Sequence, residues 1–241
     1  MAVLLELDGV SKSYGALRAT DNLTLAVDEG EALAVIGPNG AGKSTMFNLI
    51  TGDVAPDSGR VVFAGTDITA MAPHTRSRLG IGRSYQIPHP FANMTVFENL
   101  LVGAIFGARQ SERDSYDRCV EVLDLTGLLP RANAPARTLT LLQRKRLELA
   151  RALALRPKLL LLDEIGGGLT ERECRELVET IRAIHARGTT IVWIEHIVHA
   201  LVSVASRLMV MNFGQLLAEG DPHLVMADAR VKEVYMGIPA S

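Results

Sequence analysis

Two features that are scarce in the composition limit the classes of function open to this chain. Its 241 residues include only two cysteines, Cys119 and Cys174, which lie too far apart to form a CxxC pair. We therefore expect buried or inert thiols in a reducing cytosol. The excess of one sign of charge over the other is also small, because the net charge is only −2. Nucleic-acid-binding domains are usually basic, so we expect no nucleic-acid partner.

Long apolar runs are missing as well. No stretch approaches the ~18 consecutive apolar residues that a membrane-spanning helix requires. The N-terminus, "MAVLLELDGVSKSYG", has no basic segment followed by a long apolar one, so no signal peptide is expected. If the protein serves a membrane, we expect it to do so from the aqueous side.

The sequence does contain an alternation of apolar strands and helical patterns. Unbroken apolar runs occur at Ala32 to Ile36, at Leu159 to Leu162 and in "TTIVWIEH". Such runs are typical of strands buried on both faces of a parallel sheet. Helical patterns such as "ERECRELVETIRAIHARG" lie between them. This order predicts an α/β domain with a mainly parallel sheet.

Two regions depart from this alternation. Near the N-terminus, "AVLLELDGVSKSYG", "ATDNLTLAVDEG" and "GRVVFAGTDIT" predict short antiparallel strands. Between about 88 and 153 helical signals dominate, including a capping box from Thr95 to Glu98. We therefore predict one domain, 1–241, with a core and β subdomain from 1–87 and 154–241. Residues 88–153 are expected to form a helical subdomain.

The stretch "GPNGAGKS" at 37–44 matches the phosphate-loop pattern G-x-x-x-x-G-K-[ST]. Its glycines let backbone amides turn inward around phosphate oxygens, Lys43 brings positive charge to the β and γ phosphates, and Ser44 can hold Mg²⁺. The motif follows a strand and opens a helix whose positive end faces the same anions, so a chance match is disfavoured. This helix is expected to stop at Gly52, because glycine commonly ends helices. The predicted nucleotide-binding residues are Gly37, Pro38, Asn39, Gly40, Ala41, Gly42, Lys43, Ser44 and Thr45.

Polar residues end two of the apolar runs. Asp163 and Glu164 follow one run and His196 ends another. Ligands of open α/β sheets bind at the carboxyl ends of strands, so both carboxylates should face the same crevice as the phosphate loop. Asp163 is placed to hold Mg²⁺ and Glu164 to polarise the attacking water. His196 is either a γ-phosphate contact or structural, and a zinc site with His199 is disfavoured because no ligand-rich cluster lies nearby.

The order of these motifs resembles that of ABC-type ATPase domains over nearly the whole chain. The motifs are "GPNGAGKST", "GRSYQ", "QRKRLELARAL", "LLLLDE" and "IVWIEH". The resemblance implies a P-loop NTPase fold. Finer phrases resemble the ATP-binding subunits of branched-chain amino acid importers: "FANMTVFENLLVG", "GGLTERE" and the ending "VYMG".

This resemblance implies roles for further residues. Tyr14 matches the aromatic residue that stacks on adenine, and Gln86 matches the glutamine that senses Mg²⁺ and the attacking water. His196 matches the switch histidine at the γ-phosphate. The family usually has Pro at the position of Ile165 and Asp or Asn at that of Thr170, so details of a dimer interface are in doubt.

The stretch "LTLLQ" at 139–143 falls where the family has a Ser-Gly-Gly-Gln-like signature, which closes over ATP held by a second subunit. Thr140 retains a hydroxyl, but Leu141 and Leu142 replace both glycines and crowd a close backbone approach. Apart from the family, Thr140 and Gln143 form the pattern of a capping box. A capped helix start still presents amides to an anion, so we expect Thr140 and Gln143 to contact nucleotide with weaker or altered geometry.

The resemblance thus implies an ATPase that powers an ABC importer for branched-chain or other hydrophobic amino acids. ATP and Mg²⁺ are the implied cofactors. The implied partners are transmembrane permease subunits, a second ABC ATPase in a homodimer or heterodimer, and indirectly a solute-binding protein. The protein is expected to lie peripherally on the cytoplasmic face of the membrane.

Other functions stay open. The importer could carry urea, amides or organic acids, or the same ATPase could drive a lipid or polysaccharide exporter. A soluble ABC ATPase acting on DNA or ribosomes is disfavoured, since neither long coiled coils nor basic surfaces are evident. The altered signature favours a module that binds ATP without turnover, whereas Glu164 and His196 argue against it.

Overall fold

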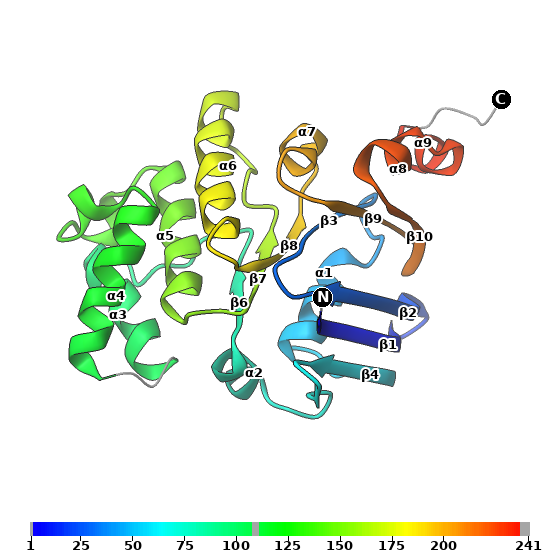
Figure 1. The fold of residues 1–241 in the computed structure, drawn as a ribbon, viewed down its shortest axis with the longest axis horizontal. Coiled ribbons are helices and arrows are strands. Elements are labelled where there is room, and N and C mark those ends of the chain that lie inside the picture. The colour runs from blue at the N-terminus through cyan, green and yellow to red at the C-terminus, as the bar shows by residue number, and fades with distance from the viewer. Residues whose placement is uncertain (1, 108–110, 237–241) are drawn as a thin grey trace. The chain divides into compact units, whose positions relative to one another are not determined.

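The computed structural model describes residues 2–107 and 111–236. Its contacts divide the chain into two compact units (Figure 1). The first unit takes in the described parts of 1–76 and 190–241, and the second takes in those of 77–189. The glycine of the ending "VYMG" lies outside the described residues.

A parallel sheet forms the centre of the first unit. Strand β3 (Ala32–Ile36) is buried along its whole length and lies between β8 (Thr190–Ile194) and β9 (Arg207–Asn212), both parallel to it. A tight turn leads from β9 to the antiparallel β10 (Gln215–Gly220). Every residue of β3 and β8 is buried, which explains why these segments have no polar alternation.

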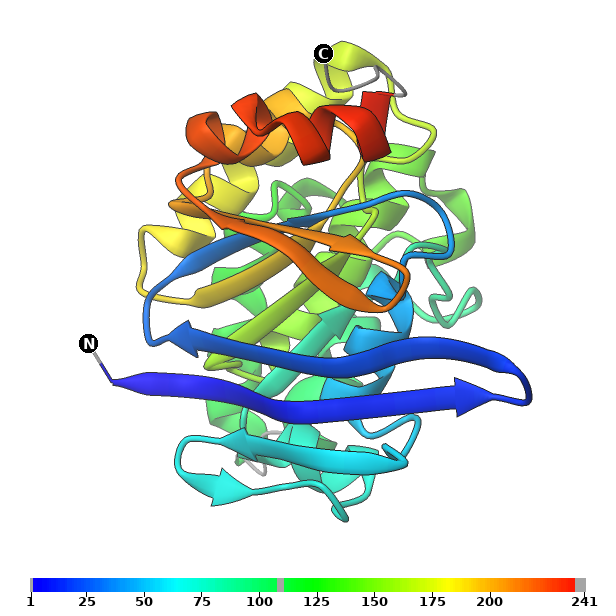
Figure 2. The same cartoon turned by 90° about the vertical axis from the view of Figure 1, so that its right-hand side faces the viewer.

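An antiparallel sheet forms the other layer of the first unit. Its strands are β1 (Val3–Tyr14), β2 (Leu17–Asp28), β4 (Ser58–Phe63) and β5 (Thr66–Asp67), in the order β2-β1-β4-β5. Figure 2 shows β1 and β2 as two long neighbouring strands, with β4 beside β1. The N-terminal antiparallel strands predicted from the sequence are thereby confirmed.

Helix α1 (Lys43–Thr51) follows β3 and ends at Gly52, as the sequence predicted. Gly52 adopts φ 82°, a left-handed conformation that glycine takes without steric cost. Three helices complete this part of the chain after β8: α7 (Val198–Val202), α8 (Pro222–Ala227) and α9 (Ala229–Met236). Among described residues, no helix is long and apolar enough to span a bilayer.

The C-terminal end of α1 is held by a buried arginine. Arg76 lies in α2 (Pro73–Leu79) and is 1% exposed. Its guanidinium donates hydrogen bonds to the carbonyl oxygens of Leu49 and Ile50 at 2.7 and 3.1 Å. It also donates to the carbonyl oxygens of Thr69 and Met71 at 2.8 and 2.9 Å. One side chain therefore joins the last turn of α1 to the segment that leads into α2.

The second unit is mainly helical around a parallel strand pair. Strands β6 (Ile81–Ser84) and β7 (Leu159–Asp163) pair in register, with Arg83 opposite Leu161. The helices are α3 (Val96–Phe106), α4 (Glu112–Leu125), α5 (Leu141–Ala154) and α6 (Glu171–His185), with 3₁₀ turns at Leu129–Arg131 and Ala136–Thr138. Helical dominance between 88 and 153 is thus found, while the predicted subdomain boundaries stay a prediction.

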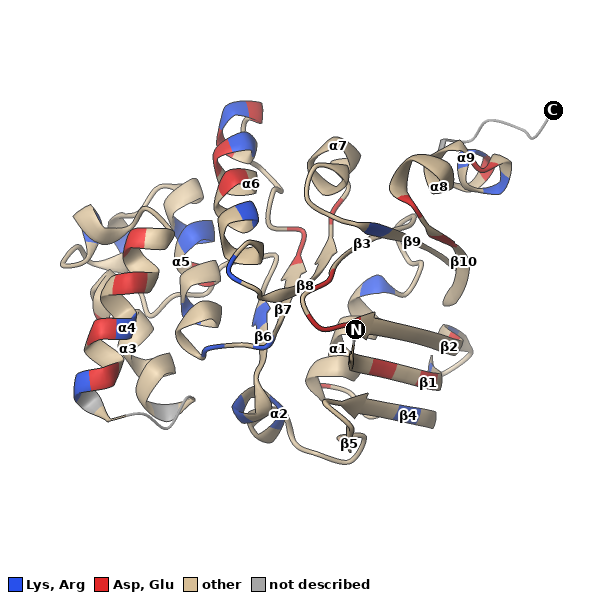
Figure 3. Ribbon diagram, in the orientation of Figure 1, with Lys and Arg blue, Asp and Glu red and all other residues tan. Residues whose placement is uncertain are grey.

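Helix starts in the second unit follow the local sequence. The predicted capping box of Thr95 and Glu98 begins α3, and a further box of Thr170 and Glu173 begins α6. Figure 3 shows acidic and basic residues alternating along the ribbon of α6. Ion pairs such as Arg182–Glu179 link neighbouring turns of this helix. Such a face of mixed sign is typical of a solvated helix.

Candidate nucleotide site

The phosphate loop of the first unit leaves the free amides of α1 uncapped. Gly42 precedes the helix at φ 100°, and among described residues no side chain caps this helix start. A Cβ on Gly42 would lie 2.2 Å from the carbonyl oxygen of Ala19 in β2, so only glycine fits there. The first amides of a helix carry partial positive charge and readily bind anions. The loop geometry therefore suits a phosphate.

Lys43 lies folded over its own loop. Its side chain is 5% exposed, and Nζ donates hydrogen bonds to the carbonyl oxygens of Gly37 and Pro38 at 2.7 and 3.1 Å. Ser44 follows on the first turn of α1 and is exposed. A cation and a hydroxyl group thus occupy the same end of the helix as the uncapped amides.

His196 lies beside this loop. It follows β8 and lines a cavity of about 310 Å³ together with Gly37, Pro38 and Asn39. Its backbone N–H donates to Oε2 of Glu195 at 3.1 Å, which fixes the main chain just after the strand. The sequence placed His196 at a γ-phosphate, and the structure brings it to the phosphate loop. Its contact with nucleotide stays a prediction.

Tyr14 ends strand β1 in the same unit and is 46% exposed. The Nζ of Lys12 lies 5.9 Å from the centre of its ring. An exposed aromatic face beside a cation is able to stack on a base. The adenine contact of Tyr14 stays a prediction.

The second unit holds the carboxylates, and each is bound by a residue from the β6 segment. Nη2 of Arg83 lies 2.7 Å from Oδ2 of Asp163, and both side chains are over 90% buried. Nε2 of Gln86 donates to Oε2 of Glu164 at 2.6 Å. Glu164 has φ 44°, a left-handed conformation that is rare outside glycine and is often found at functional sites. The structure therefore joins predicted residues Gln86 and Glu164 directly.

The signature-like stretch is a capped helix start, as the sequence pattern predicted. The Thr140 hydroxyl accepts from the N–H of Gln143 at 3.3 Å, and Oε1 of Gln143 accepts from the N–H of Thr140 at 3.1 Å. Leu142 is buried, whereas Leu141 is 43% exposed. A Cβ on Gly168 would lie 3.2 Å from Cδ2 of Leu141, so this leucine packs against the loop before α6.

Comparison with known proteins decides the family. Residues 20–166 match the family model described as ABC transporter. The high-affinity branched-chain amino acid transport ATP-binding protein LivG of Salmonella typhimurium is 34% identical, and the match covers 97% of this chain and 98% of LivG. The chain belongs to the ABC transporter family.

Solved structures of ABC transporter cassettes agree. The ADP conformation of MJ1267, an ATP-binding cassette of an ABC transporter, is 32% identical with a TM-score of 0.90, covering 99% of this chain and 100% of that chain. A dimeric post-hydrolysis state of the ATP-binding cassette MJ0796, bound to ADP and Pi, is 25% identical with a TM-score of 0.82, covering 91% and 99%. The predicted ABC-type fold is confirmed, and the domain is an ATP-binding ATPase.

The residue types of this ABC domain fit a magnesium ion. Mg²⁺ prefers oxygen ligands and usually takes one or two protein ligands together with phosphate oxygens and water. Ser44 offers a hydroxyl, Asp163 a carboxylate and Gln86 an amide oxygen. Among described residues no group of three or more His, Cys, Asp or Glu lies together as a metal cluster. The donor set suits an ion that arrives with a nucleotide.

Sequence reasoning missed two residues of the ABC domain that bind predicted site residues. Arg83 pairs with Asp163, and Nζ of Lys145 donates to the main-chain oxygen of Gln86 at 2.6 Å. For Arg83, the sequence signal was a basic residue within a short apolar strand. Lys145 lies in a basic run, and no feature of the sequence distinguishes it from the neighbouring arginines.

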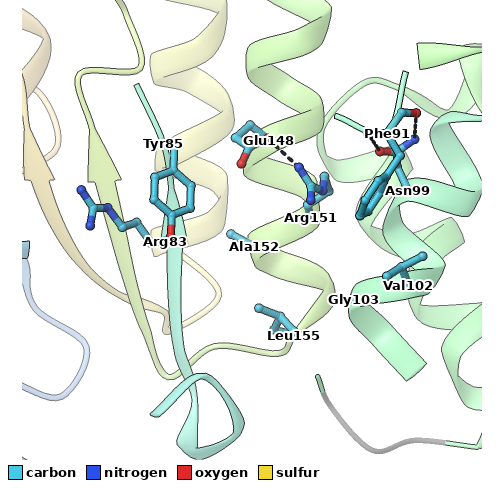
Figure 4. Close-up of a pocket in the computed structure, with 10 residues that line it drawn as sticks. All are labelled: Arg83, Tyr85, Phe91, Asn99, Val102, Gly103, Glu148, Arg151, Ala152 and Leu155. Atoms are coloured by element: carbon cyan, nitrogen blue, oxygen red, sulfur yellow. Dashed lines mark hydrogen bonds and ion pairs between the residues drawn. The ribbon is translucent and has the colours of Figure 1, made fainter. Parts of the chain in front are cut away.

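A second cavity, of about 200 Å³, opens in the second unit of the ABC domain. Figure 4 shows its lining from the β6 segment, α3 and α5. The guanidinium of Arg83 lies 4.8 Å from the ring centre of Tyr85, and that of Arg151 lies 5.2 Å from that of Phe91. Asn99 binds the main chain of Phe91 at 2.8 and 3.1 Å. Two aromatic rings, each beside a guanidinium group, thus line the cavity.

Proposed function

We propose that this chain is the ATPase subunit of an ABC importer for branched-chain or other hydrophobic amino acids. The observation that carries the proposal is the 34% identity to LivG, a branched-chain amino acid transport ATP-binding protein, over 97% of this chain. The intact phosphate loop and the Gln86–Glu164 contact support turnover rather than binding alone.

The proposed mechanism gives each predicted site residue one role toward ATP. The loop amides and Lys43 bind phosphates, and the Tyr14 ring stacks on adenine. Glu164 accepts a hydrogen bond from the attacking water and polarises it, while Gln86 orients Glu164. His196 contacts the γ-phosphate. Glu164, Gln86 and His196 act by position and by charge, so they are needed more for the transition state than for binding.

Magnesium belongs to the proposed site as well. Ser44, Asp163 and Gln86 would hold the ion, which neutralises charge on the β and γ phosphates when bound. The Arg83 guanidinium keeps the buried carboxylate of Asp163 paired and oriented. The ion pair would therefore hold the Asp163 carboxylate in place as an oxygen ligand at the end of an otherwise apolar strand.

The proposal includes partners. A second ABC ATPase, as a homodimer or a heterodimer, would complete each nucleotide site, as the dimeric state of MJ0796 suggests by analogy. Thr140 and Gln143 would face the nucleotide of that partner. Transmembrane permease subunits would receive the motion near Gln86, with the aromatic cavity of Figure 4 as a docking place. The subunit would lie on the cytoplasmic face, with a solute-binding protein acting indirectly and no nucleic-acid partner.

A binding-only module is the second candidate, since Leu141 and Leu142 replace signature glycines and Leu141 packs on Gly168. Urea, amides, organic acids and an exported lipid or polysaccharide stay alternatives for the transported solute. Uptake of radiolabelled leucine by cells that carry the full transporter distinguishes them from the proposed solute. Uptake should depend on this chain and compete with isoleucine and valine but not with urea.

Turnover is tested with the purified chain and its Lys43→Ala and Glu164→Gln variants. Both variants should lose at least about 100-fold in kcat, because removing one preorganised group costs about that much. Glu164→Gln should still bind ATP and, in Mg-free ATP, should shift in mass to a dimer if self-pairing occurs. Equal turnover by all three proteins would disprove the ATPase mechanism.

A further inference from the structure

A buried lysine connects the signature helix to the predicted water-polarising carboxylate. Lys145 lies one turn into α5 and is 4% exposed. Its Nζ donates a 2.6 Å hydrogen bond to the main-chain oxygen of Gln86, whose side chain donates a 2.6 Å bond to Glu164. Two hydrogen bonds, joined through the residue Gln86, thus connect the helix α5 that follows "LT" to Glu164.

The Gln86 main chain lies beyond the ladder that orders β6. That ladder ends at the pair Ser84–Leu162, and residues 85–90 have no helix or strand. The Gln86 side chain is also exposed, so packing restricts its rotamers little. The Lys145 bond to the carbonyl therefore restrains a segment that the sheet does not restrain.

The other cations of α5 have different partners. Arg144 donates to the carbonyl oxygen of Leu139 at 3.0 Å, and Arg151 pairs with Glu148 at 3.0 Å. Burying a lysine costs free energy that an apolar side chain of similar length does not incur. A cation at position 145 is thus explained by the carbonyl that it binds, not by the packing of the helix.

We propose that Lys145 is a positioning residue for ATP hydrolysis, which fixes the Gln86 main chain and through it the orientation of Glu164. This inference rests on the proposed function, because it assigns Glu164 to the attacking water. Because Lys145 binds the main chain of Gln86, we expect it to affect kcat through Glu164 and to leave ATP affinity unchanged.

The first test compares Lys145→Met with Lys158→Met in the full chain. Methionine keeps the length of the side chain and removes its charge and donor, and Lys158 is an exposed lysine of the same unit. Lys145→Met should lower kcat roughly 10- to 100-fold, since a displacement of about 1 Å at a reacting group costs up to about that much. The KM for ATP and the affinity for a fluorescent ATP analogue should stay within about twofold. Lys158→Met should match the unmodified chain.

A double-mutant cycle with Gln86→Ala tests whether Lys145 affects kcat through Gln86. Gln86→Ala keeps the carbonyl that Lys145 binds but removes the amide that holds Glu164. If Lys145 acts through Gln86, adding Lys145→Met to Gln86→Ala should lower kcat by less than about twofold more. A merely structural role would instead give the full loss in both backgrounds.

Three results would overturn the inference. One is unchanged kcat in Lys145→Met while Glu164→Gln is inactive, and another is an undiminished Lys145→Met effect in the Gln86→Ala background. The third is loss of ATP-analogue binding, or of the folded state in thermal unfolding, by Lys145→Met. If the unmodified chain turns over no faster than Glu164→Gln, the proposed function fails first and this inference fails with it.

Discussion

Replacing Arg76 by methionine should destabilise the first unit strongly. The substitution removes the donor for four carbonyl oxygens, those of Leu49, Ile50, Thr69 and Met71. Carbonyls in the last turn of a helix have no partner further along it, so those of α1 depend on such donors. At about 1 kcal/mol for each acceptor left without a donor, the loss is about 4 kcal/mol. Relief from burying a charge offsets part of it, so a net loss of about 2–4 kcal/mol results.

Urea unfolding followed by tryptophan fluorescence measures this loss. The chain has one tryptophan, Trp193 in β8, which is buried in the same unit as Arg76 and reports on its unfolding. With a slope of about 3 kcal/mol per molar urea, the midpoint should fall by about 0.7–1.3 M. The urea midpoint of Arg76→Lys should lie between those of the unmodified chain and Arg76→Met, because a single ammonium group cannot reproduce the planar guanidinium fork.

Arg78→Met is the matched control, since Arg78 lies on the same helix α2 and is exposed. It should change the free energy of unfolding by less than about 0.5 kcal/mol. A change below about 1 kcal/mol for Arg76→Met would refute the idea that this guanidinium anchors α1.

Three other measurements test the structure. Gly42→Ala should abolish binding of an ATP analogue, because its Cβ would lie 2.2 Å from a carbonyl oxygen of β2; retained affinity would contradict the loop geometry. Burial raises the pKa of the Cys119 thiol to about 11, and Cys174 is buried too, so both should react with a thiol reagent at pH 8 only after unfolding. Hydrogen bonds from the Thr95 N–H and hydroxyl lower the pKa of Glu98 from its usual 4.5. A lowered folded-state pKa gives stability that is present above the usual value and is lost as pH falls through the folded one. Helicity should therefore fall below about pH 4.5, less steeply in Glu98→Gln; equal slopes would show that this cap does not matter.

Local rules predicted those parts of the molecule that short stretches of sequence determine. The phosphate loop, the end of α1 at Gly52 and the caps at Thr95 and Thr140 all follow from residues within a few positions of each other. Buried strands such as β3 were recognisable because a strand covered on both faces needs no polar residues. These features carried the fold class and the nucleotide-binding half of the site.

Long-range polar contacts were beyond the same rules. Arg83, Lys145 and Arg76 each bind groups at least five residues away, and most of their partners are carbonyls, which every residue has. A basic residue in a sequence is usually on the surface, so no pattern marks the few that are buried. The packing of Leu141 on Gly168 was hidden for a related reason, because it depends on how α5 and the loop before α6 approach each other.

The folded-back position of Lys43 has a consequence for ligand selection. Its ammonium is already bound to the carbonyl oxygens of Gly37 and Pro38, so a phosphate oxygen that binds Nζ must compete with two internal acceptors. A singly charged anion offers little more than these carbonyls do, whereas the adjoining phosphates of a triphosphate carry several charges. The loop thus selects among anions by their charge, independently of any contact with the base. Chloride or acetate at cellular concentration should therefore leave the Lys43 hydrogen bonds to Gly37 and Pro38 unchanged.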